Sequence, residues 1–329
     1  MQRGKNRWIR SLLILSVTAL FLGITVTAKA TDSLRVLFVG NSYTYYNSMP
    51  QLFKAMVESR FPDLRIKTKF VGGGGATLKQ HWETGIVSEE LETSKWDYVV
   101  LQGQSTLGTG FREDGKWYFG SPDQFFFYTR KLDQLIKANG AKTILYMTWA
   151  KKAYPNQQKY LTYAYMHIAK ELGSRVAPVG IVWDNLRTSK SFELYRKDGS
   201  HPTIHGSFLA GATLFSVIFN TVPTRLPGRL EGYKILRGGR LASEKSLLCN
   251  LSERDVKTIE NAVAIIFEKL QNNNGYLDVK KAVSNKKPSL LSYISRLLTT
   301  SQGQAVILLV IALFVLAVKG VRRFSKPLQ

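Results

Sequence analysis

Short, nearly continuous apolar runs alternate with helical patterns along this 329-residue chain, and this alternation constrains the fold more than any other feature. A run of this kind is typical of a strand buried on both faces. Residues 34–39 form the run of this kind, and further short β-rich runs occupy residues 65–71, 98–101, 143–149 and 176–179. Helical patterns lie between them, at about residues 50–60, 124–139 and 158–172. The order predicts an α/β fold with a central, mostly parallel five-stranded sheet and helices on both faces.

In an open parallel sheet, ligands bind beyond the carboxyl ends of the strands. The candidate functional segments are therefore those that follow the predicted strands. They read GNSYT at 40–44, GGGGAT at 72–77, QGQS at 102–105 and, near the end of the α/β region, DGSHP at 198–202. The four-glycine run lacks the Gly-Lys-Ser/Thr ending of a phosphate loop, so we predict no nucleotide there.

Three side chains in these segments have the chemistry of an activated nucleophile. Ser42 sits on a tight turn and can present its hydroxyl, His201 can accept the proton, and Asp198 can fix the imidazole tautomer. The developing oxyanion also needs donors, which a glycine N–H after the second strand and a glutamine amide after the third can supply. On local sequence alone, Ser42 could equally serve only as a helix N-cap.

The four segments resemble the sequence blocks of the SGNH/GDSL hydrolase superfamily of esterases and lipases, over roughly residues 34–220. Gly40-Asn41-Ser42 is similar to the nucleophile block, with Asn41 where the family usually has Asp. Gly75 matches the glycine block by its Gly-Ala-Thr context. The stretch from Asp198 through His201 to the proline at 202 closely matches the last block.

The third block departs from the usual Gly-x-Asn of the superfamily. Gln102-Gly103-Gln104-Ser105 is instead similar to the Gln-Gly-Glu segment of carbohydrate O-acetylesterase members. The resemblance implies that one glutamine completes the oxyanion hole. Spacing favours Gln104, whereas likeness to the acetylesterases favours Gln102, and both stay candidates.

The resemblance implies a three-layer, flavodoxin-like α/β/α fold and a serine ester hydrolase. In that interpretation Ser42, His201 and Asp198 form the triad, and the N–H groups of Ser42 and Gly75 belong to the oxyanion hole with the glutamine. No cofactor and no metal are expected. The predicted substrate is an O-acyl group, with O-acetyl as the leading candidate, on an extracytoplasmic carbohydrate. The alternatives are a lipase or lysophospholipase at the membrane surface, a membrane-tethered O-acyltransferase and a catalytically idle carbohydrate-binding module.

Other reactive side chains carry weaker signals. His205 follows His201 at a metal-ligand spacing, but no Glu or Cys nearby completes a site. His167 lies among apolar helical residues and is interpreted as structural, and His81 is expected to line the pocket or cap a helix. The single cysteine, Cys249, is expected to be a small buried hydrophobe. Aromatics in the insertion at 105–128 could stack on sugar rings, wall an acyl pocket or simply pack together.

Both ends of the chain carry targeting patterns. Residues 1–30 read as a signal peptide, with basic residues, an uncharged run at 11–28 and a small-x-small pattern at 28–30. A retained N-terminal anchor is the alternative. Residues 297–321 are predicted to span the membrane, ahead of a basic cytoplasmic tail at 322–329. The hydrolase domain would then occupy residues 31–290, exported and anchored outside the cytoplasmic membrane.

The basic excess, 46 Lys and Arg against 23 Asp and Glu, first suggests nucleic acid. However, residues 1–30 hold five basic and no acidic residues, and residues 303–329 hold four and none. Export also removes nucleic acid as a partner. The remaining excess gathers in an extension from about residue 221, notably at 225–245, where a solvated basic loop is favoured over a site for lipid headgroups or anionic polymer. A helix is predicted from about 252 to 272. The oligomeric state stays open.

Overall fold

The computed structural model of the protein describes residues 33–189 and 192–277. The predicted signal peptide, membrane span and cytoplasmic tail lie outside these residues. Within the described residues, no helix has the length and apolar character needed to cross a membrane.

A five-stranded, entirely parallel sheet forms the centre of the described fold, as the sequence predicts. Its strands, in chain order, are β1 (Ser33–Gly40), β2 (Arg65–Gly72), β3 (Tyr98–Gln102), β6 (Lys142–Tyr146) and β7 (Arg175–Ala177). Their spatial order is β2-β1-β3-β6-β7. This is the flavodoxin-like order, whose switch point lies between the first and third strands. The carboxyl ends of β1 and β3 therefore flank the expected ligand crevice.

The last two strands end earlier than the sequence predicts. The Met147 N–H still donates to the Ala177 carbonyl at 3.0 Å, but the Met147 carbonyl then accepts from the Gly180 N–H at 3.0 Å. Pro178 has no N–H to continue the ladder and stands as N-cap of the helix that follows. Residues 147–149 and 178–179 therefore leave the sheet at its carboxyl edge.

Helices connect the strands on both sides of the sheet. They are α2 (Ser42–Tyr45), α3 (Met49–Arg60), α4 (Leu78–Glu83), α5 (Ile86–Thr93), α6 (Asp123–Ala138), α7 (Gln158–Leu172), α8 (Val179–Leu186), α9 (Ile204–Phe219) and α10 (Glu253–Gln271). Three 3₁₀ turns accompany them: η1 (Tyr46–Ser48), η2 (Pro155–Gln157) and η3 (Arg237–Gly239). The three helices predicted between strands are confirmed within one residue at each end. The short α4 and α5, which break at Gly85, were not predicted.

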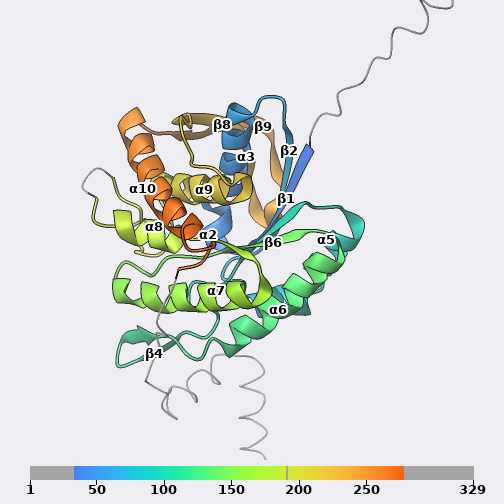
Figure 1. Cartoon of the computed structure of the whole chain (residues 1–329), viewed down its shortest axis with the longest axis vertical. Helices are drawn as coiled ribbons and strands as arrows, with labels where there is room; N and C mark the ends of the chain where they lie inside the picture. The colour runs from blue at the N-terminus through green and yellow to red at the C-terminus, as the bar shows by residue number, and fades with distance from the viewer. Residues whose placement is uncertain (1–32, 190–191, 278–329) are drawn as a thin grey trace, which may run out of the picture. The chain divides into compact units, whose positions relative to one another are not determined.

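The alternating side chains of the sheet enter two separate cores. Val36 and Phe38 face a core shared with α3, α8, α9 and α10, whereas Leu37 and Val39 face one shared with α5, α6 and α7. Figure 1 shows these two helix layers on opposite sides of the sheet. The three-layer α/β/α prediction is therefore confirmed. The central strands β1 and β3 are buried on both faces, which explains why they read as nearly unbroken apolar runs, whereas the edge strand β2 alternates buried residues with exposed Arg65, Lys67 and Lys69.

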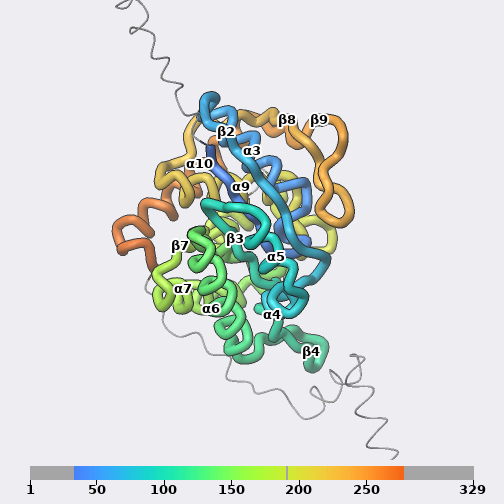
Figure 2. Tube along the Cα trace, turned by 90° about the vertical axis from the view of Figure 1, so that its right-hand side faces the viewer, coloured from blue at the N-terminus to red at the C-terminus, as the bar shows by residue number. Residues whose placement is uncertain are grey.

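The extension beyond residue 221 forms a hairpin and a helix, so the expectation of a loop is wrong, although its basic side chains at 225–245 are exposed to solvent as expected. β8 (Arg229–Ile235) and β9 (Leu241–Asn250) form an antiparallel hairpin that packs beside α3 (Figure 2). Leu230, Leu248 and Cys249 are buried against the core, and this burial holds the hairpin in place. The predicted helix after it is confirmed as α10, where the Ser252 hydroxyl accepts from the Asp255 N–H. A smaller hairpin, β4 (Phe111–Glu113) with β5 (Lys116–Tyr118), lies in the insertion.

Candidate active site

The turn after β1 presents Ser42 without using its hydroxyl as a cap. Asn41 is the N-cap of α2, because its side-chain oxygen accepts from the Tyr43 N–H at 3.0 Å. Its amide nitrogen donates to the Ala76 carbonyl at 3.0 Å, which ties the glycine loop to the same turn. Asn41 therefore performs the capping that the sequence also allowed for Ser42. The Ser42 hydroxyl is left for another partner.

A close approach of three segments makes glycine necessary just before this turn. A Cβ on Gly40 would lie 2.5 Å from the Thr44 hydroxyl oxygen and 2.6 Å from the Gln102 side-chain oxygen. Real Cβ contacts are never this short, so any larger residue would force β1 and β3 apart at their carboxyl ends. Gly40 thus allows the Ser42 turn to sit directly against the end of β3.

Ser42, His201 and Asp198 form one hydrogen-bonded relay. His201 Nε2 lies 3.0 Å from Ser42 Oγ, and His201 Nδ1 lies 2.7 Å from Asp198 Oδ2. Serine and histidine are 159 residues apart in the chain. Both distances are hydrogen-bond distances, so the imidazole can accept the serine proton while the carboxylate fixes its tautomer.

The Asp198 carboxylate is held in its charged form. Partial burial acts to raise the pKa of Asp198, but hydrogen bonds from the His201 ring and from the N–H groups of Ser200 and His201 outweigh it. Together they lower the pKa to about 2. Asp198 Oδ1 accepts the two N–H groups at 2.8 and 2.9 Å, which leaves Oδ2 aimed at the imidazole. The carboxylate is therefore positioned and ionised before any substrate arrives.

Aromatic rings that the sequence analysis did not single out surround the histidine. Tyr46 stacks on the His201 ring with centroids 4.3 Å apart, and Tyr43 meets it edge-on at 5.7 Å. Tyr43 in turn stacks on Trp149, and burial raises the pKa of the Tyr43 phenol to about 12. Trp149 donates from its indole nitrogen to the Ser200 carbonyl at 2.9 Å. Trp149 follows β6, so the carboxyl-end rule could have found it.

Two backbone N–H groups are available for an oxyanion. Within the described residues, neither the Ser42 N–H nor the Gly75 N–H has a hydrogen-bond partner. Gly75 is exposed and has φ of +68°, a conformation that glycine adopts without strain. The bond from Asn41 to Ala76, the next residue, keeps this glycine beside the Ser42 turn. Both N–H groups fit the roles that the family resemblance implies.

The structure separates the two candidate glutamines. Gln102 is fully buried, and its side-chain oxygen accepts from the Asn41 N–H at 2.8 Å and from the Thr44 hydroxyl at 2.9 Å. Its amide nitrogen donates to the Gly103 carbonyl. One N–H of this amide is used in that bond, and the whole side chain is buried, so the structure favours Gln104 over Gln102 as the oxyanion donor. Gln102 fixes the nucleophile turn instead.

Gln104 keeps its donor free. Its side-chain oxygen accepts from the Thr106 N–H at 2.6 Å and from the Thr106 hydroxyl at 2.7 Å. These bonds fix which end of the amide is oxygen, so the nitrogen points away from the Thr106 turn. Within the described residues this nitrogen has no partner. Gln104 is partly exposed after β3, where the crevice is expected.

This difference predicts two distinct mutant phenotypes. Gln104→Ala should lower kcat for ester hydrolysis by about 10²-fold, because an oxyanion donor acts mainly in the transition state. Gln102→Ala should instead destabilise the fold by about 3 kcal/mol, because it leaves a buried N–H unpaired and opens a cavity. Steady-state kinetics and urea unfolding of both variants check the pair. If both variants lost kcat equally and neither lost stability, the division of roles between Gln104 and Gln102 would be wrong.

His81 supports the end of β1 and makes no hydrogen bond to the Ser42–His201–Asp198 relay within the described residues. It is buried, and its Nε2 lies 3.1 Å from the Gly40 carbonyl oxygen, to which it donates. This helix residue holds the end of β1 and does not cap a helix, which was one of the two roles expected for it. Burial lowers the pKa of His81, although the bond to Gly40 opposes the shift.

The lowered pKa of His81 makes stability depend on pH. Below about pH 6.5, His81 is protonated in the unfolded chain but stays neutral in the folded chain. The free energy of unfolding therefore decreases as pH falls toward the lower pKa that His81 has in the folded chain. We expect wild type to lose stability between pH 7.5 and pH 5 relative to His81→Gln, by at most about 1.4 kcal/mol per pH unit. Urea unfolding of both chains across this range measures the difference. A difference that is independent of pH would contradict the assignment.

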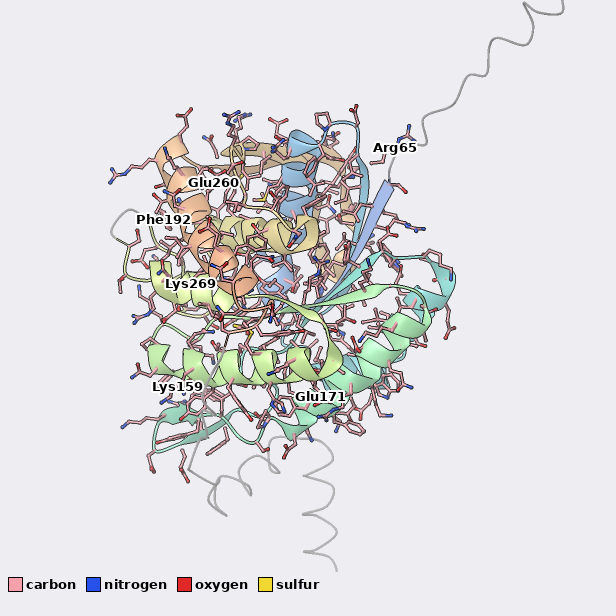
Figure 3. All side chains as sticks on the ribbon, in the orientation of Figure 1. Arg65, Lys159, Glu171, Phe192, Glu260 and Lys269 are labelled. Atoms are coloured by element: carbon pink, nitrogen blue, oxygen red, sulfur yellow. The ribbon has the colours of Figure 1, made fainter. Side chains whose placement is uncertain are left out.

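The remaining candidates have structural contacts. His205 stacks on Phe192 (labelled in Figure 3) at 4.6 Å, and its Nε2 lies 3.3 Å from Asp255. The described residues contain no group of three or more His, Cys, Asp and Glu side chains that could hold a metal ion. His167 contacts Phe126 on α6 and Tyr163 on α7 but is exposed, so it is not the enclosed structural residue that its apolar neighbours in the sequence suggested.

The structure shows the surroundings of Cys249 and of the aromatic insertion at 105–128. Burial raises the pKa of Cys249 to about 11, so it is a protonated, buried side chain as expected. In the insertion, Phe119 and Phe125 are buried in the core, whereas Trp117 is half-buried with the Lys151 ammonium 4.4 Å from its ring centroid. The insertion therefore combines core packing with an aromatic surface near residue 151.

Comparison with known proteins gives structural likeness only. No family model matches the chain, and no curated protein matches it. A candidate SGNH hydrolase from Slackia heliotrinireducens is similar in structure, with a TM-score of 0.45 and 25% identity over 57% of this chain and 100% of that chain. A variant acetyl xylan esterase from Geobacillus stearothermophilus has a TM-score of 0.46 and 16% identity over 58% and 98% of the two chains. TesA has a TM-score of 0.45 and 16% identity over 56% and 97%.

Proposed function

We propose that the protein is a serine ester hydrolase that removes O-acyl groups, and O-acetyl groups in particular, from an extracytoplasmic carbohydrate. The observation that carries the proposal is the relay in which His201 lies 3.0 Å from the Ser42 hydroxyl and 2.7 Å from the Asp198 carboxylate. A hydroxyl is a weak nucleophile at neutral pH, and this arrangement is a way to activate it.

The first half of the reaction forms an acyl-enzyme. Ser42 Oγ attacks the ester carbonyl carbon while its proton passes to His201 Nε2, and Asp198 stabilises the imidazolium. The carbonyl oxygen becomes an oxyanion that the N–H groups of Ser42 and Gly75 and the Gln104 amide can bind. The tetrahedral intermediate then breaks the bond to the sugar oxygen, and His201 returns the proton to that oxygen as the alcohol leaves.

The second half restores the enzyme with water. A water molecule loses a proton to His201 Nε2 as its oxygen attacks the acyl carbonyl carbon. The bond from that carbon to Ser42 Oγ breaks, the proton returns to the serine, and a free carboxylic acid departs. These steps use only the side chains and backbone of this chain.

Two features support a carbohydrate as the group that carries the ester. Gln102-Gly103-Gln104 resembles the corresponding segment of carbohydrate O-acetylesterases. In addition, the half-buried Trp117 lies against Lys151, and the neighbouring Lys152 N–H donates to the Gly199 carbonyl at 2.8 Å. An aromatic surface thus adjoins the loop that carries Asp198, and a flat ring of this kind suits stacking on a pyranose.

The test uses the full chain with a fluorophosphonate probe and p-nitrophenyl esters. We expect covalent labelling on the peptide that contains Ser42 and faster hydrolysis of the acetate than of long-chain esters. Absence of both labelling and hydrolysis would favour an idle carbohydrate-binding module. A preference for long acyl chains would indicate a lipase, and acetyl transfer to an added oligosaccharide in competition with water would indicate a transferase.

We further propose that the enzyme is exported and held at the cytoplasmic membrane by residues 297–321. The support is the sequence pattern at both ends of the chain, and the expected partners are the acylated substrate and the membrane rather than nucleic acid. Amino-terminal sequencing of the mature protein tests the predicted cleavage after Ala30. An intact N-terminus would favour the retained anchor.

A further inference from the structure

The β8–β9 hairpin exposes an unusual amount of apolar surface. Six large hydrophobic side chains are exposed in the described part of the chain, and three of them lie on this hairpin: Leu236 at 47%, Leu241 at 47% and Leu247 at 41%. Leu236 and Leu241 bracket the turn, here called the hairpin tip (residues 236–241). Single exposed leucines are ordinary, but three within twelve residues mark a surface that contacts something apolar.

Unpaired cations surround these leucines. Arg237 and Arg240 lie in the tip, Lys234 and Lys245 lie just below it, and all four are exposed. Within the described residues, no acidic side chain forms an ion pair with any of them, and Glu244 is the one acid between residues 232 and 250. The tip therefore offers leucines and positive charge on the same short element.

The leucines are presented by a closed turn rather than by a loose loop. The Leu236 N–H donates to the Arg240 carbonyl at 2.7 Å, and the Gly239 N–H donates to the Leu236 carbonyl at 3.1 Å. At the base of the hairpin, the Leu226 N–H donates to the Glu260 carboxylate at 2.7 Å (Glu260 is labelled in Figure 3). The hairpin is thus hydrogen-bonded both before its first strand and at its tip, so the backbone that carries the leucines has a defined conformation.

The tip also lies close to the candidate active site. The Ile235 N–H donates to the Ser48 hydroxyl at 2.9 Å, and Ser48 ends the same 3₁₀ turn, η1, whose Tyr46 stacks on His201. A Cβ on Gly239 would lie 3.0 Å from the Phe70 carbonyl oxygen, near the carboxyl end of β2. A surface bound by the tip would therefore face the carboxyl edge of the sheet, where Ser42 lies.

From this combination we propose that the hairpin tip docks on an anionic lipid bilayer. Leu236 and Leu241 enter the boundary between headgroups and acyl chains, while Arg237 and Arg240 contact the lipid phosphates. An anionic polymer in water would satisfy the arginines but leave the leucines exposed, so the apolar component favours lipid. The inference concerns binding alone and does not depend on ester hydrolysis.

Hydrogen–deuterium exchange of the full chain assembled with lipid nanodiscs tests the proposal. We expect amides at 236–241 to exchange about tenfold more slowly on discs that contain phosphatidylglycerol than on pure phosphatidylcholine discs. Arg237→Gln with Arg240→Gln should abolish this difference. At about 1 M salt, where surface charge is screened, wild type should keep part of its protection from exchange at 236–241. The double variant Leu236→Ser with Leu241→Ser should lose this remaining protection. For each variant, the exchange rate on one kind of disc is divided by the rate of the same variant on the other. Unchanged exchange in the core strands shows that the fold is intact.

Matched substitutions on α10 provide the control. Ile265 is 48% exposed, and Arg254 and Lys257 are exposed cations on the same helix. Ile265→Ser and the pair Arg254→Gln with Lys257→Gln should leave the tip protection unchanged. Equal exchange on both kinds of disc would overturn the proposal. A second result would also overturn it: dextran sulfate without lipid protects the tip as well as anionic discs do, and Leu236→Ser has no effect on that protection. This result would indicate a site for an anionic polymer.

Discussion

Replacing Ser42 by alanine should lower kcat/KM for p-nitrophenyl acetate on the order of 10⁴-fold or more, because the acyl-enzyme can no longer form. The Ser42 hydroxyl contributes one hydrogen bond, to His201, and the N-cap function next to it belongs to Asn41. The substitution should therefore leave the fold and its stability almost unchanged. Initial rates and fluorophosphonate labelling, both measured on the same preparation, report the loss.

Ser243→Ala provides the matched control for this loss. Ser243 is an exposed serine on β9, so the same substitution there should change the rate by less than about twofold. If Ser42→Ala retained activity within tenfold of wild type, or if labelling persisted at the same site, Ser42 would not be the nucleophile. Loss of activity accompanied by unfolding in the urea titration would point to a structural role instead.

Asp198→Asn should reduce kcat on the order of 10³-fold while leaving KM within a few-fold. An asparagine amide facing His201 Nδ1 can donate a hydrogen bond, which stabilises the imidazole tautomer whose Nε2 carries the proton. That tautomer cannot accept the proton of Ser42, although the side chain has nearly the same shape. The two N–H groups that Asp198 Oδ1 accepts, from Ser200 and His201, can still bind the asparagine oxygen.

The low pKa of Asp198 also fixes its charge over a wide pH range. Its pKa of about 2 lies below the usual value of 3.8, so the carboxylate stays ionised as pH falls and is neutralised only near pH 2. Carbon NMR of the side-chain carboxyls in wild type and Asp198→Asn should therefore show no titration of Asp198 between pH 8 and about pH 4. A titration of this carboxyl near pH 5 would contradict its assignment as a permanently charged partner of His201.

Asp184→Asn controls for the loss of a surface carboxylate. Asp184 is paired with Arg187 on the exposed side of α8, with side chains 45% and 36% exposed. Such pairs contribute little, so activity should stay within about twofold of wild type. A comparable loss at Asp184 and Asp198 would indicate a general charge effect rather than a relay.

Local patterns in the sequence were enough to predict the sheet. Residues such as Val36 through Val39 contact helices on both sides, so a central strand must be apolar at nearly every position, and this requirement is visible without knowledge of its neighbours. The candidate relay was also accessible, because the carboxyl-end rule limits attention to a few residues after each strand. Ser42 was found in this way, whereas Asp198 and His201 follow no strand of the sheet and were found by their residue types and spacing.

Other features depend on contacts between distant residues, which no local pattern reveals. Tyr46 was passed over because its ring is meaningful only once His201 stacks on it. The residues at 225–245 read as a basic loop because a two-stranded hairpin buries only a few positions, Leu230 among them. That its leucines are exposed could be recognised only from the exposed fraction of each side chain in the folded chain.

The sequence by itself therefore determined the α/β architecture and the types of side chain that gather at the carboxyl edge of the sheet. The tertiary structure decided what each of them does there. Gln102 and Gln104 are indistinguishable by residue type, yet Gln102 accepts from Asn41 and Thr44, which are 61 and 58 residues away, whereas Gln104 accepts from its own turn and keeps its amide donor free. The strand pattern is local because burial acts on each residue separately, whereas the direction of an amide is set by the partners that folding brings to it.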